Sequence, residues 1–272
     1  MPPFRARPGV MADKPQRSEA AETTRFLLKL ALFVLLFRSF VIAPFSIPSE
    51  SMLPRLLIGD YLLVTKWNYG YSRWSLPWGL PLIPGHIFAN APERGDVAVF
   101  RSHPVTDHGV NKRVIGLPGD TVQMRGGQLF LNGRAIPKQR VADFTVPISP
   151  NYTCETQYQD LTEEGRVCRY ARFRETLPGG RSYYVLDQAN IPEADDTGVF
   201  RVPAGHVFMM GDNRDRSGDS RFAPPVGFYF VPMRNLEGKA LVTFFSTDGS
   251  AEWLKPWTWV SAARWDRIGE TF

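Results

Sequence analysis

The sequence predicts a mainly β protein that follows a single helix near its amino end. Three observations lead to this prediction. One apolar run, residues 26–45, is long enough for a membrane-spanning helix. The rest of the chain holds short β-branched and aromatic runs bounded by turn residues. The 272 residues include 23 Gly and 23 Pro, which favours many turns and short strands over long helices.

Composition excludes several classes of protein. Hydrophobic residues make up 43% and charged residues 22% of the chain, as in ordinary globular domains. The net charge of +5 is mild and comes without a dense Lys/Arg stripe, so we expect no nucleic-acid partner. Two cysteines cannot build a four-thiolate zinc site, and the four histidines show no zinc-binding spacing. We therefore expect no metal.

The apolar run 26–45 is interpreted as a membrane anchor. A helix of about twenty residues reaches roughly 30 Å, the thickness of the hydrocarbon layer. Lys29 can snorkel, whereas Arg38 either reaches the far headgroups or marks a shorter, shifted span. Residues 1–25 carry more cations than the twenty residues or so after Phe45, which keeps the amino end cytoplasmic, as a flexible arm. The alternatives are a buried core helix and a cleavable signal peptide, although no small-x-small cleavage site follows cleanly.

Short strands are predicted through the remaining chain, at 60–66, 96–100, 110–115, 128–131, 182–186, 206–210 and 239–245. Asn132-Gly133 supplies the positive φ angles of a tight hairpin turn. The more polar stretch 122–205 is interpreted as an inserted subdomain. Residues 46–121 and 206–250 then form one domain, and 251–272 an aromatic tail.

The cysteines and tryptophans each leave two interpretations open. Cys154 and Cys168 form either a disulfide, worth about 3 kcal/mol outside the cytoplasm, or two free thiols. The tryptophans fall in two clusters, and the first cluster either dips into the membrane interface or packs in an aromatic core. These are Trp67, Trp74 and Trp78, and then Trp253, Trp257, Trp259 and Trp265.

A lysine in a predicted strand is the first candidate for chemistry. By alternation along the strand, Lys112 shares its face with Val110 and Val114. An apolar surrounding disfavours the ammonium form and lowers the lysine pKa, as a general base requires. The alternative is a lysine that snorkels from a strand edge. Arg113 cannot lose its proton, so the two neighbouring cations have separate roles.

A serine just beyond the predicted anchor is the second candidate. Ser51 lies in a turn flanked by prolines, where free backbone N–H groups can stabilise an oxyanion. It becomes a nucleophile only if a base removes its proton. Ser49 could add a hydroxyl donor. The alternative is a serine that only completes a turn.

The segment 211–221 (GDNRDRSGDSR) mixes acids and arginines. It partly matches the start of a calcium loop, but the twelfth position is Pro224 instead of a bidentate Glu. The mixed charges favour a salt-bridged loop that braces a site. A Ser-His-Asp triad stays open on spacing alone, since triads have no fixed order.

Three segments in this order resemble bacterial signal peptidase I (leader peptidase), a membrane protease with a Ser–Lys dyad. They are PSESMLP (48–54), NKRVIGLPGD (111–120) and GDNRDRSGDSR (211–221), behind an amino-terminal anchor. The resemblance covers residues 26–121 and 206–246, about half of the chain. It implies an antiparallel β catalytic domain with a smaller β-rich insertion.

Site roles follow from the resemblance at the matching positions. Ser51 matches the nucleophile and Lys112 the general base. Ser49 and the Ser51 N–H match the oxyanion hole, and Ser217 matches a hydroxyl that positions the lysine amine. Residues matching bracing ion pairs are Asp212, Asp219, Arg113 and Arg221; residues expected to line shallow apolar substrate pockets are Phe45, Ile47, Pro48, Met52 and Leu56.

Three positions depart from the family pattern. Glu50 replaces a frequent Gly between the serines, and by alternation it should face away from the site. Asn111 stands where an Ile often precedes the lysine, which puts the substrate pocket in doubt. The stretch 223–226 lengthens the third segment without touching the matched dyad.

The resemblance implies an endopeptidase that removes signal peptides from exported preproteins, after small residues, without metal or cofactor. Expected partners are preproteins and membrane lipid, and the protein is expected to be a monomer in the bacterial inner membrane with its catalytic domain outside. One alternative is a membrane-tethered binding or assembly module that needs no dyad. A regulatory autoprotease would need a DNA-binding domain, for which a 25-residue arm is too short.

Overall fold

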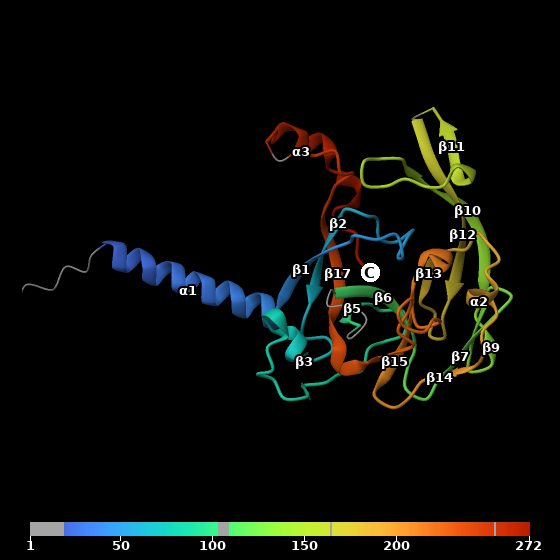
Figure 1. Ribbon diagram of the computed structural model, residues 1–272, viewed down its shortest axis with the longest axis horizontal. Helices are drawn as coiled ribbons and strands as arrows, with labels where there is room; N and C mark the ends of the chain where they lie inside the picture. Colours follow the sequence, from blue (N-terminus) through green and yellow to red (C-terminus); the bar gives the residue numbers. More distant parts are fainter. Residues whose placement is uncertain (1–18, 103–108, 164, 253) are drawn as a thin grey trace, which may run out of the picture. The chain divides into compact units, whose positions relative to one another are not determined.

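A seven-stranded antiparallel sheet forms the centre of the fold, and its strands come from both ends of the chain. In the computed structural model, which describes residues 19–102, 109–163, 165–252 and 254–272, the strand order is β1-β2-β17-β5-β6-β15-β16 (Figure 1). The strands are β1 (Ile42–Ser46), β2 (Asp60–Thr65), β5 (Val97–Arg101), β6 (Gly109–Gly116), β15 (His206–Met210), β16 (Phe230–Pro232) and β17 (Leu236–Ser246).

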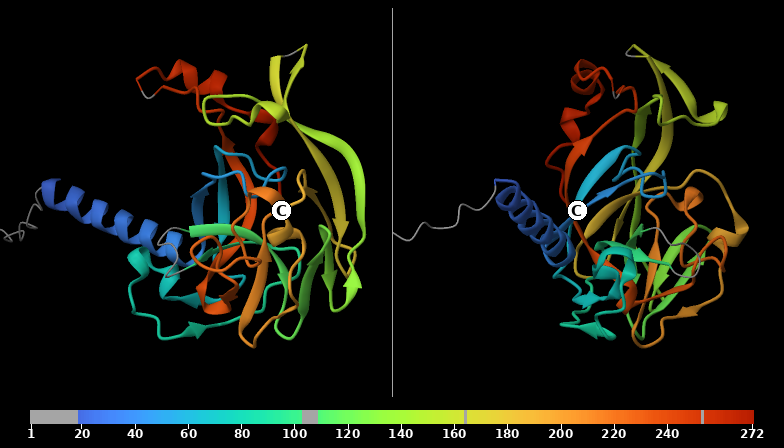
Figure 2. Two further views of the ribbon diagram at one scale, coloured as in Figure 1. Left: turned by 45° about the vertical axis from the view of Figure 1, so that its right-hand side comes forward. Right: turned by 60° about the vertical axis from the view of Figure 1, so that its left-hand side comes forward.

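The chain between β6 and β15 builds two further sheets. One has the order β10-β12-β11, with β13 also paired to β12, and the other has the order β14-β7-β8-β9. β10 and β12 run as a long paired ribbon (Figure 2). The bounds are β7 (Thr121–Arg125), β8 (Gln128–Leu131), β9 (Arg134–Ala135), β10 (Lys138–Pro147), β11 (Gln159–Thr162), β12 (Gly165–Thr176), β13 (Ser182–Leu186) and β14 (Phe200–Arg201). The remaining short strands and α-helices are β3 (Tyr71–Ser72), β4 (His86–Ile87), α2 (Pro192–Asp195) and α3 (Trp257–Ala262).

The predicted strands agree closely with these elements. β8, β13 and β15 have the predicted bounds, and β2, β5, β6 and β17 differ from the prediction by up to three residues at an end. The hairpin between β8 and β9 turns at Asn132 and Gly133, with φ of 51° and 74°. Positive φ at both positions is what this turn needs. The mainly β fold class is confirmed.

The helix α1 (Glu19–Phe40) begins and ends earlier than predicted. Glu19 and Glu22 lie in its first turn, where carboxylates stabilise the helix dipole. The prediction of one helix over 26–45 was wrong at its end, because Ile42–Ser46 is a strand paired with β2. Pro44 is tolerated there because β1 is an edge strand. By length and hydropathy, no helix in the described part of the chain qualifies as a membrane span.

The inserted segment shares its cores with the central sheet. Ile115, Phe208 and Met210 of β6 and β15 pack with Val122 and Met124 of β7. A second cluster joins the turn after β1 to the β10–β12 ribbon, through Leu53, Leu57, Val146, Tyr170 and Leu186. Residues Phe37–Phe272 accordingly form one compact unit.

The open questions on cysteines and tryptophans are answered in part. Cys154 and Cys168 form a disulfide, with Cα atoms 6.0 Å apart. Trp78 is 91% exposed, and Trp257 and Trp265 are also exposed, so these rings do not form an aromatic core. Trp253, His103, His108 and residues 1–18 of the predicted arm lie outside the described residues.

Candidate active site

Ser51 lies in the turn between β1 and β2, and this turn is fixed from two sides. Within the turn, the Leu53 N–H donates to the Glu50 carbonyl at 3.0 Å. From the segment after β15, the Asn213 N–H donates to the Ser51 carbonyl at 3.1 Å, and Asn213 Nδ2 donates to the Glu50 carbonyl at 3.2 Å. The Ser51 turn is therefore held in place by Asn213, which lies about 160 positions away in the sequence.

Lys112 comes from the middle of β6 and points its amine at this serine. Its Nζ lies 2.7 Å from Ser51 Oγ and 3.0 Å from the Asn111 carbonyl oxygen. Lys112 pairs with Ala98 of β5, so the two share a face, and Ala98 and Val114 belong to one buried apolar cluster. The lysine is only 4% exposed.

The surroundings of Lys112 favour its neutral form. Burial lowers the pKa of its amine from 10.5 to about 8, against the opposing pull of the carboxylates of Asp219 and Asp212. At pH 7 about a tenth of the amines are then neutral, instead of a few in ten thousand. An amine in this range is suited to take a proton from a nearby hydroxyl.

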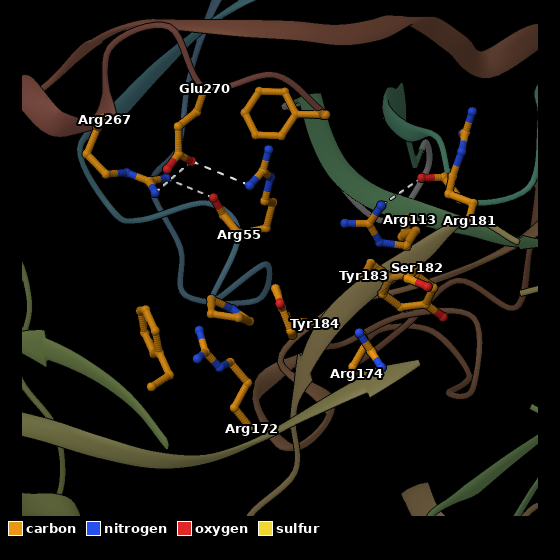
Figure 3. A pocket seen from close by; sticks show the side chains of 14 residues that line it. Arg55, Arg113, Arg172, Arg174, Arg181, Ser182, Tyr183, Tyr184, Arg267 and Glu270 are labelled. Carbon is orange, nitrogen blue, oxygen red and sulfur yellow. Dashed lines mark hydrogen bonds and ion pairs between the residues drawn. The ribbon is translucent and has the colours of Figure 1, made fainter. Parts of the chain in front are cut away.

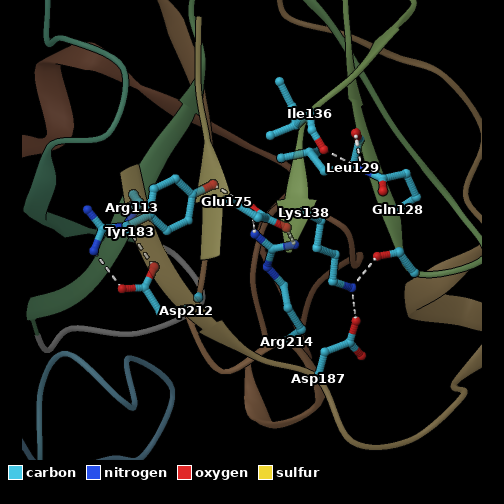
Figure 4. Close-up of polar contacts among 12 residues, drawn as sticks. Arg113, Gln128, Leu129, Ile136, Lys138, Glu175, Tyr183, Asp187, Asp212 and Arg214 are labelled. Carbon is cyan, nitrogen blue, oxygen red and sulfur yellow. Dashed lines mark hydrogen bonds and ion pairs between the residues drawn. The ribbon is translucent and has the colours of Figure 1, made fainter. Parts of the chain in front are cut away.

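Each of these two carboxylates is held by an arginine. Arg113 donates to both carboxylate oxygens of Asp212, at 2.7 and 2.6 Å (Figure 4). Arg221 donates to both oxygens of Asp219, at 2.9 and 3.0 Å. All four side chains are buried. Because the guanidinium groups balance the carboxylates, less negative potential reaches the Lys112 amine.

Ser49 and Ser217 are placed differently around the dyad. Ser49 Oγ lies 3.4 Å from Ser51 Oγ on an exposed residue. Ser217 is buried, and its Oγ has no hydrogen-bond partner among the described residues, so the contact expected with the lysine amine is not made. The Ser217 side chain packs closely against the Cα of Gly211, at the spot a Cβ would occupy.

The residues expected to line substrate pockets divide into two groups. Ile47, Met52 and Leu56 are at most 2% exposed and belong to one core cluster. They form the support of the Ser51 turn, and contact with a substrate would require this core to open. Phe45 is partly buried and Pro48 is exposed.

Sequence reasoning missed one buried ion pair behind the site, between Arg214 and Glu175. Arg214 lies in the charged segment 211–221, and this charge pattern was the sequence feature that could have indicated a buried ion pair. Glu175 ends a strand in the polar insertion and has no motif around it. In the described part of the chain, no three His, Cys, Asp or Glu residues gather as a metal site.

The arrangement supports acyl transfer. A hydroxyl, a buried amine within hydrogen-bond distance and a rigid turn are the parts of an activated serine nucleophile. Both residues are supported by hydrogen bonds or packing from the sheet. Because no histidine of the described residues contacts Ser51, the lysine is the base that the described geometry offers.

Comparisons with known proteins agree on one family. Residues 20–245 match the family model described as signal peptidase, peptidase S26. Signal peptidase I of Rickettsia typhi is 38% identical over 89% of this chain and 84% of its own, and that of Rickettsia canadensis is 38% identical over 86% of each chain. A solved signal peptidase I from Enterococcus faecalis is 28% identical over 55% of this chain and 97% of its own; the TM-score of 0.29 is too low to compare folds.

Proposed function

The chain belongs to the signal peptidase S26 family, and from that premise we propose that it is a membrane-bound serine endopeptidase that cleaves amino-terminal signal peptides from exported preproteins. The observation that carries the proposal is the 2.7 Å contact between Lys112 Nζ and Ser51 Oγ in a buried setting. Signal peptidase I acts on preproteins that bear signal peptides, so these are the substrates.

Acylation begins when the neutral Lys112 amine takes the proton of Ser51. The Oγ then attacks the carbonyl carbon of the scissile bond, and the developing oxyanion accepts hydrogen bonds from the Ser51 N–H and the Ser49 hydroxyl. As the C–N bond breaks, the Lys112 ammonium returns a proton to the leaving amine. The signal peptide is left as an ester on Ser51.

Deacylation repeats the proton transfers with water. Lys112 takes a proton from a water molecule, whose oxygen attacks the ester carbonyl, and the proton then returns to Ser51 Oγ. The hydrogen bond from Lys112 to the Asn111 carbonyl at 3.0 Å supports this role because it orients the amine while Ser51 is acylated. No metal or cofactor enters either half of the reaction.

Substrate binding by strand addition is supported by the place of β1. This strand ends the seven-stranded sheet, so one of its edges is available to an extended peptide. Phe45 at its end and Pro48 beyond it would contact the side chains that precede the scissile bond. Family resemblance assigns small side chains to the positions one and three residues before that bond.

We propose that the chain is anchored in the bacterial inner membrane through the apolar part of α1, residues 26–40, once, with its amino end cytoplasmic and its catalytic domain outside. The excess of cations in residues 1–25 supports the orientation, and the Cys154–Cys168 disulfide supports an oxidising compartment. We propose a monomer, because one chain supplies both Ser51 and Lys112.

The exposed tryptophans support contact with membrane lipid. Trp78 is 91% exposed in a segment that also exposes Leu80 and Leu82. In proteoliposomes that hold the full chain, lipids brominated on the acyl chain should quench tryptophan fluorescence more in wild type than in Trp78→Phe. Equal quenching in wild type and in Trp78→Phe would mean that Trp78 lies in water and does not contact the lipid.

The decisive experiment is cleavage of a model preprotein by the full chain in detergent. Wild type should release the mature protein with a single new amino terminus, identified by mass spectrometry. Ser51→Ala and Lys112→Met should each lower cleavage by at least about 10⁴-fold, as loss of a nucleophile or base does. Ser250→Ala, in an exposed turn, is the matched serine control and should cleave normally.

A tethered binding or assembly module is the competing function. It predicts that Ser51→Ala folds and functions as wild type does, with no new amino terminus in either. Circular dichroism and a thermal melt on each variant separate loss of chemistry from loss of fold. Cleavage retained by folded Ser51→Ala would reject the dyad.

A further inference from the structure

The peptide bond between Glu50 and Ser51 carries one half of the expected oxyanion hole. Its N–H belongs to Ser51 and its carbonyl belongs to Glu50, and in a trans peptide these two groups point in opposite directions. Whatever orients the Glu50 carbonyl therefore also orients the Ser51 N–H. Among the described residues the Ser51 N–H donates no hydrogen bond, which leaves it available to an oxyanion.

Two donors hold the Glu50 carbonyl. The Leu53 N–H belongs to the same turn and lies 3.0 Å from the carbonyl oxygen, and Asn213 Nδ2 comes from the segment after β15 and lies 3.2 Å from it. The far side of the turn is fixed separately, because Arg267 of the carboxyl-terminal segment donates to the Arg55 carbonyl at 2.8 Å (Figure 3). This contact lies at the wall of a cavity of about 670 Å³. The backbone of the turn is thus held at both of its ends.

The Glu50 side chain is held by two tyrosines of the insertion. Its carboxylate is hydrogen-bonded to the Tyr152 hydroxyl, which lies 2.8 Å from the hydroxyl of Tyr170 on β12. Each hydroxyl has one proton and an ionised carboxylate only accepts, so the hydrogen bonds run from Tyr170 to Tyr152 to Glu50. Burial raises the pKa of Tyr152, and the Tyr170 hydroxyl and the Glu50 carboxylate raise it further, so Tyr152 keeps the proton that it donates.

The two tyrosines are themselves fixed in place. A disulfide joins Cys154 to Cys168 of β12. Tyr152 lies two residues before the first cysteine, and Tyr170 lies two residues after the second. Both tyrosines are at most 7% exposed, and with Cys168 they pack against Leu53 in one buried cluster. The insertion therefore presents a rigid hydroxyl donor to the turn that carries the nucleophile.

We propose that Glu50 is a positioning residue for the oxyanion hole and that Tyr152 is the residue that anchors it. The carboxylate of Glu50 is fixed by the tyrosine pair and its carbonyl by two donors, so the peptide that carries the Ser51 N–H cannot swing. A residue without this side chain would leave that peptide held at its carbonyl alone. The inference rests on the proposed function and adds to it a role for the insertion in orienting the catalytic turn.

The negative charge of Glu50 does not account for this role. Among the described residues, the carboxylates that act on the pKa of the Lys112 amine are those of Asp219 and Asp212, and Glu50 is not one of them. A substitution that removes the Glu50 charge and keeps an oxygen in its place should therefore leave the pH dependence of cleavage unshifted.

The test measures cleavage of one model preprotein by the full chain in detergent. Glu50→Ala and Tyr152→Phe should each lower kcat about 10- to 100-fold and change KM by less than about threefold, because the substrate still binds while the oxyanion loses an aligned donor. Glu50→Gln should stay within about threefold of wild type at every pH, since its amide oxygen still accepts from Tyr152. The double variant Glu50→Ala/Tyr152→Phe should be no slower than Glu50→Ala, because both changes break one contact.

A peptide aldehyde supplies a second readout. Ser51 Oγ adds to its carbonyl carbon, and the resulting oxygen lies where the oxyanion of the reaction forms. The inhibition constant of the aldehyde should therefore rise by the same factor as kcat/KM falls. Glu193→Ala and Tyr184→Phe, which change exposed residues of the insertion, are the matched controls and should behave as wild type. If Glu50→Ala melts at a lower temperature, Tyr152→Phe, which removes a single oxygen, gives the deciding result.

Three results would overturn the positioning role. They are a normal kcat in folded Tyr152→Phe, effects that multiply in the double variant, and an inhibition constant for the aldehyde that stays unchanged. A loss in Glu50→Gln as large as in Glu50→Ala would also overturn it, because the effect would then belong to the charge. Failure of wild type to cleave the preprotein at all would instead overturn the proposed function, and this role with it.

Discussion

Glu175 and Arg214 form an ion pair from which water is almost completely excluded. Arg214 Nη1 lies 2.7 Å from Glu175 Oε1, and the Tyr183 hydroxyl donates to Glu175 Oε2 at 2.7 Å (Figure 4). Although burial alone would raise it, the Arg214 guanidinium holds the pKa of Glu175 below its ordinary value. The pair connects the end of β12 in the insertion to the segment that carries Asn213 and Ser217.

Glu175→Gln should therefore destabilise the protein strongly, since it leaves the Arg214 charge buried without a partner. We expect a loss of about 3–5 kcal/mol in the free energy of unfolding, measured by urea denaturation. Arg169→Gln, which breaks the exposed pair with Asp160, should cost less than about 1 kcal/mol. Equal effects of the two substitutions would mean that the buried pair does not brace the site.

Activity should rise with pH on an acid limb centred near the Lys112 pKa of about 8. Only the neutral amine accepts the Ser51 proton, so kcat/KM should fall about tenfold for each pH unit below this midpoint. A kcat/KM profile on one preprotein measures the limb. Lys112→Arg should be inactive at every pH, because guanidinium does not deprotonate. A flat profile between pH 6 and 9 would contradict the assignment.

The buried Lys112 should lower the free energy of unfolding at neutral pH. The pKa of Lys112 in the folded protein, about 8, lies below the ordinary 10.5. Between these two pH values the unfolded chain binds more protons than the folded protein, so the free energy of unfolding rises with pH. Below pH 8 the full penalty, roughly 3 kcal/mol, is present. Lys112→Met should therefore unfold at higher urea concentration than wild type at pH 7, with the difference shrinking toward pH 10. A destabilised variant at pH 7 would argue against this penalty.

Ser217→Ala should show whether the Ser217 hydroxyl positions the Lys112 amine or whether Ser217 only packs against its neighbours. The buried Ser217 hydroxyl has no hydrogen-bond partner in the part of the chain that the structure describes, so its removal should change stability by less than about 1 kcal/mol. If it positions the Lys112 amine during the reaction, kcat should fall about 10- to 100-fold, as for a missing orienting hydrogen bond, and the acid limb should shift. A normal kcat with an unshifted limb would leave Ser217 a packing residue only.

Gly211→Ala should disable the site through the backbone. A Cβ at Gly211 would run into the Ser217 side chain and the Ser51 carbonyl oxygen, and backbone cannot move aside cheaply. Displacing Ser51 by about 1 Å should cost on the order of 10²-fold in kcat/KM. Gly198→Ala is the control, because nothing lies within 4 Å of its added methyl group. Similar kinetics for the two variants would show that the turn adapts.

Local patterns were enough to predict much of the central sheet. Strands such as β6 and β15, which are buried along most of their length, are marked by β-branched and other apolar residues in their own sequence, and Asn132-Gly133 encodes its own hairpin. The strand β1 was missed because its apolar residues continue the helical run without a break in composition. Hydropathy alone does not distinguish the end of a helix from the start of an edge strand.

The site was predicted in part. The residues in local motifs were found, and those whose partners lie far away in the sequence were missed. Ser51 and Lys112 lie in recognisable motifs, and the structure brings them together. Glu175 lies in a polar ribbon whose partners are set by pairing across the insertion. Long-range pairings of this kind depend on the fold and leave no local pattern.

The insertion leaves the central sheet after β6 and returns at β15, which is the neighbour of β6 in that sheet. The end of β6 and the start of β15 are held by the hydrogen bonds between these two strands, whatever the length of the chain that joins them. Related enzymes are thus free to lengthen or shorten this excursion, because the entropy of closing it grows only slowly with its length. Evolution can remodel the chain between β6 and β15 while the serine and the lysine keep their separation.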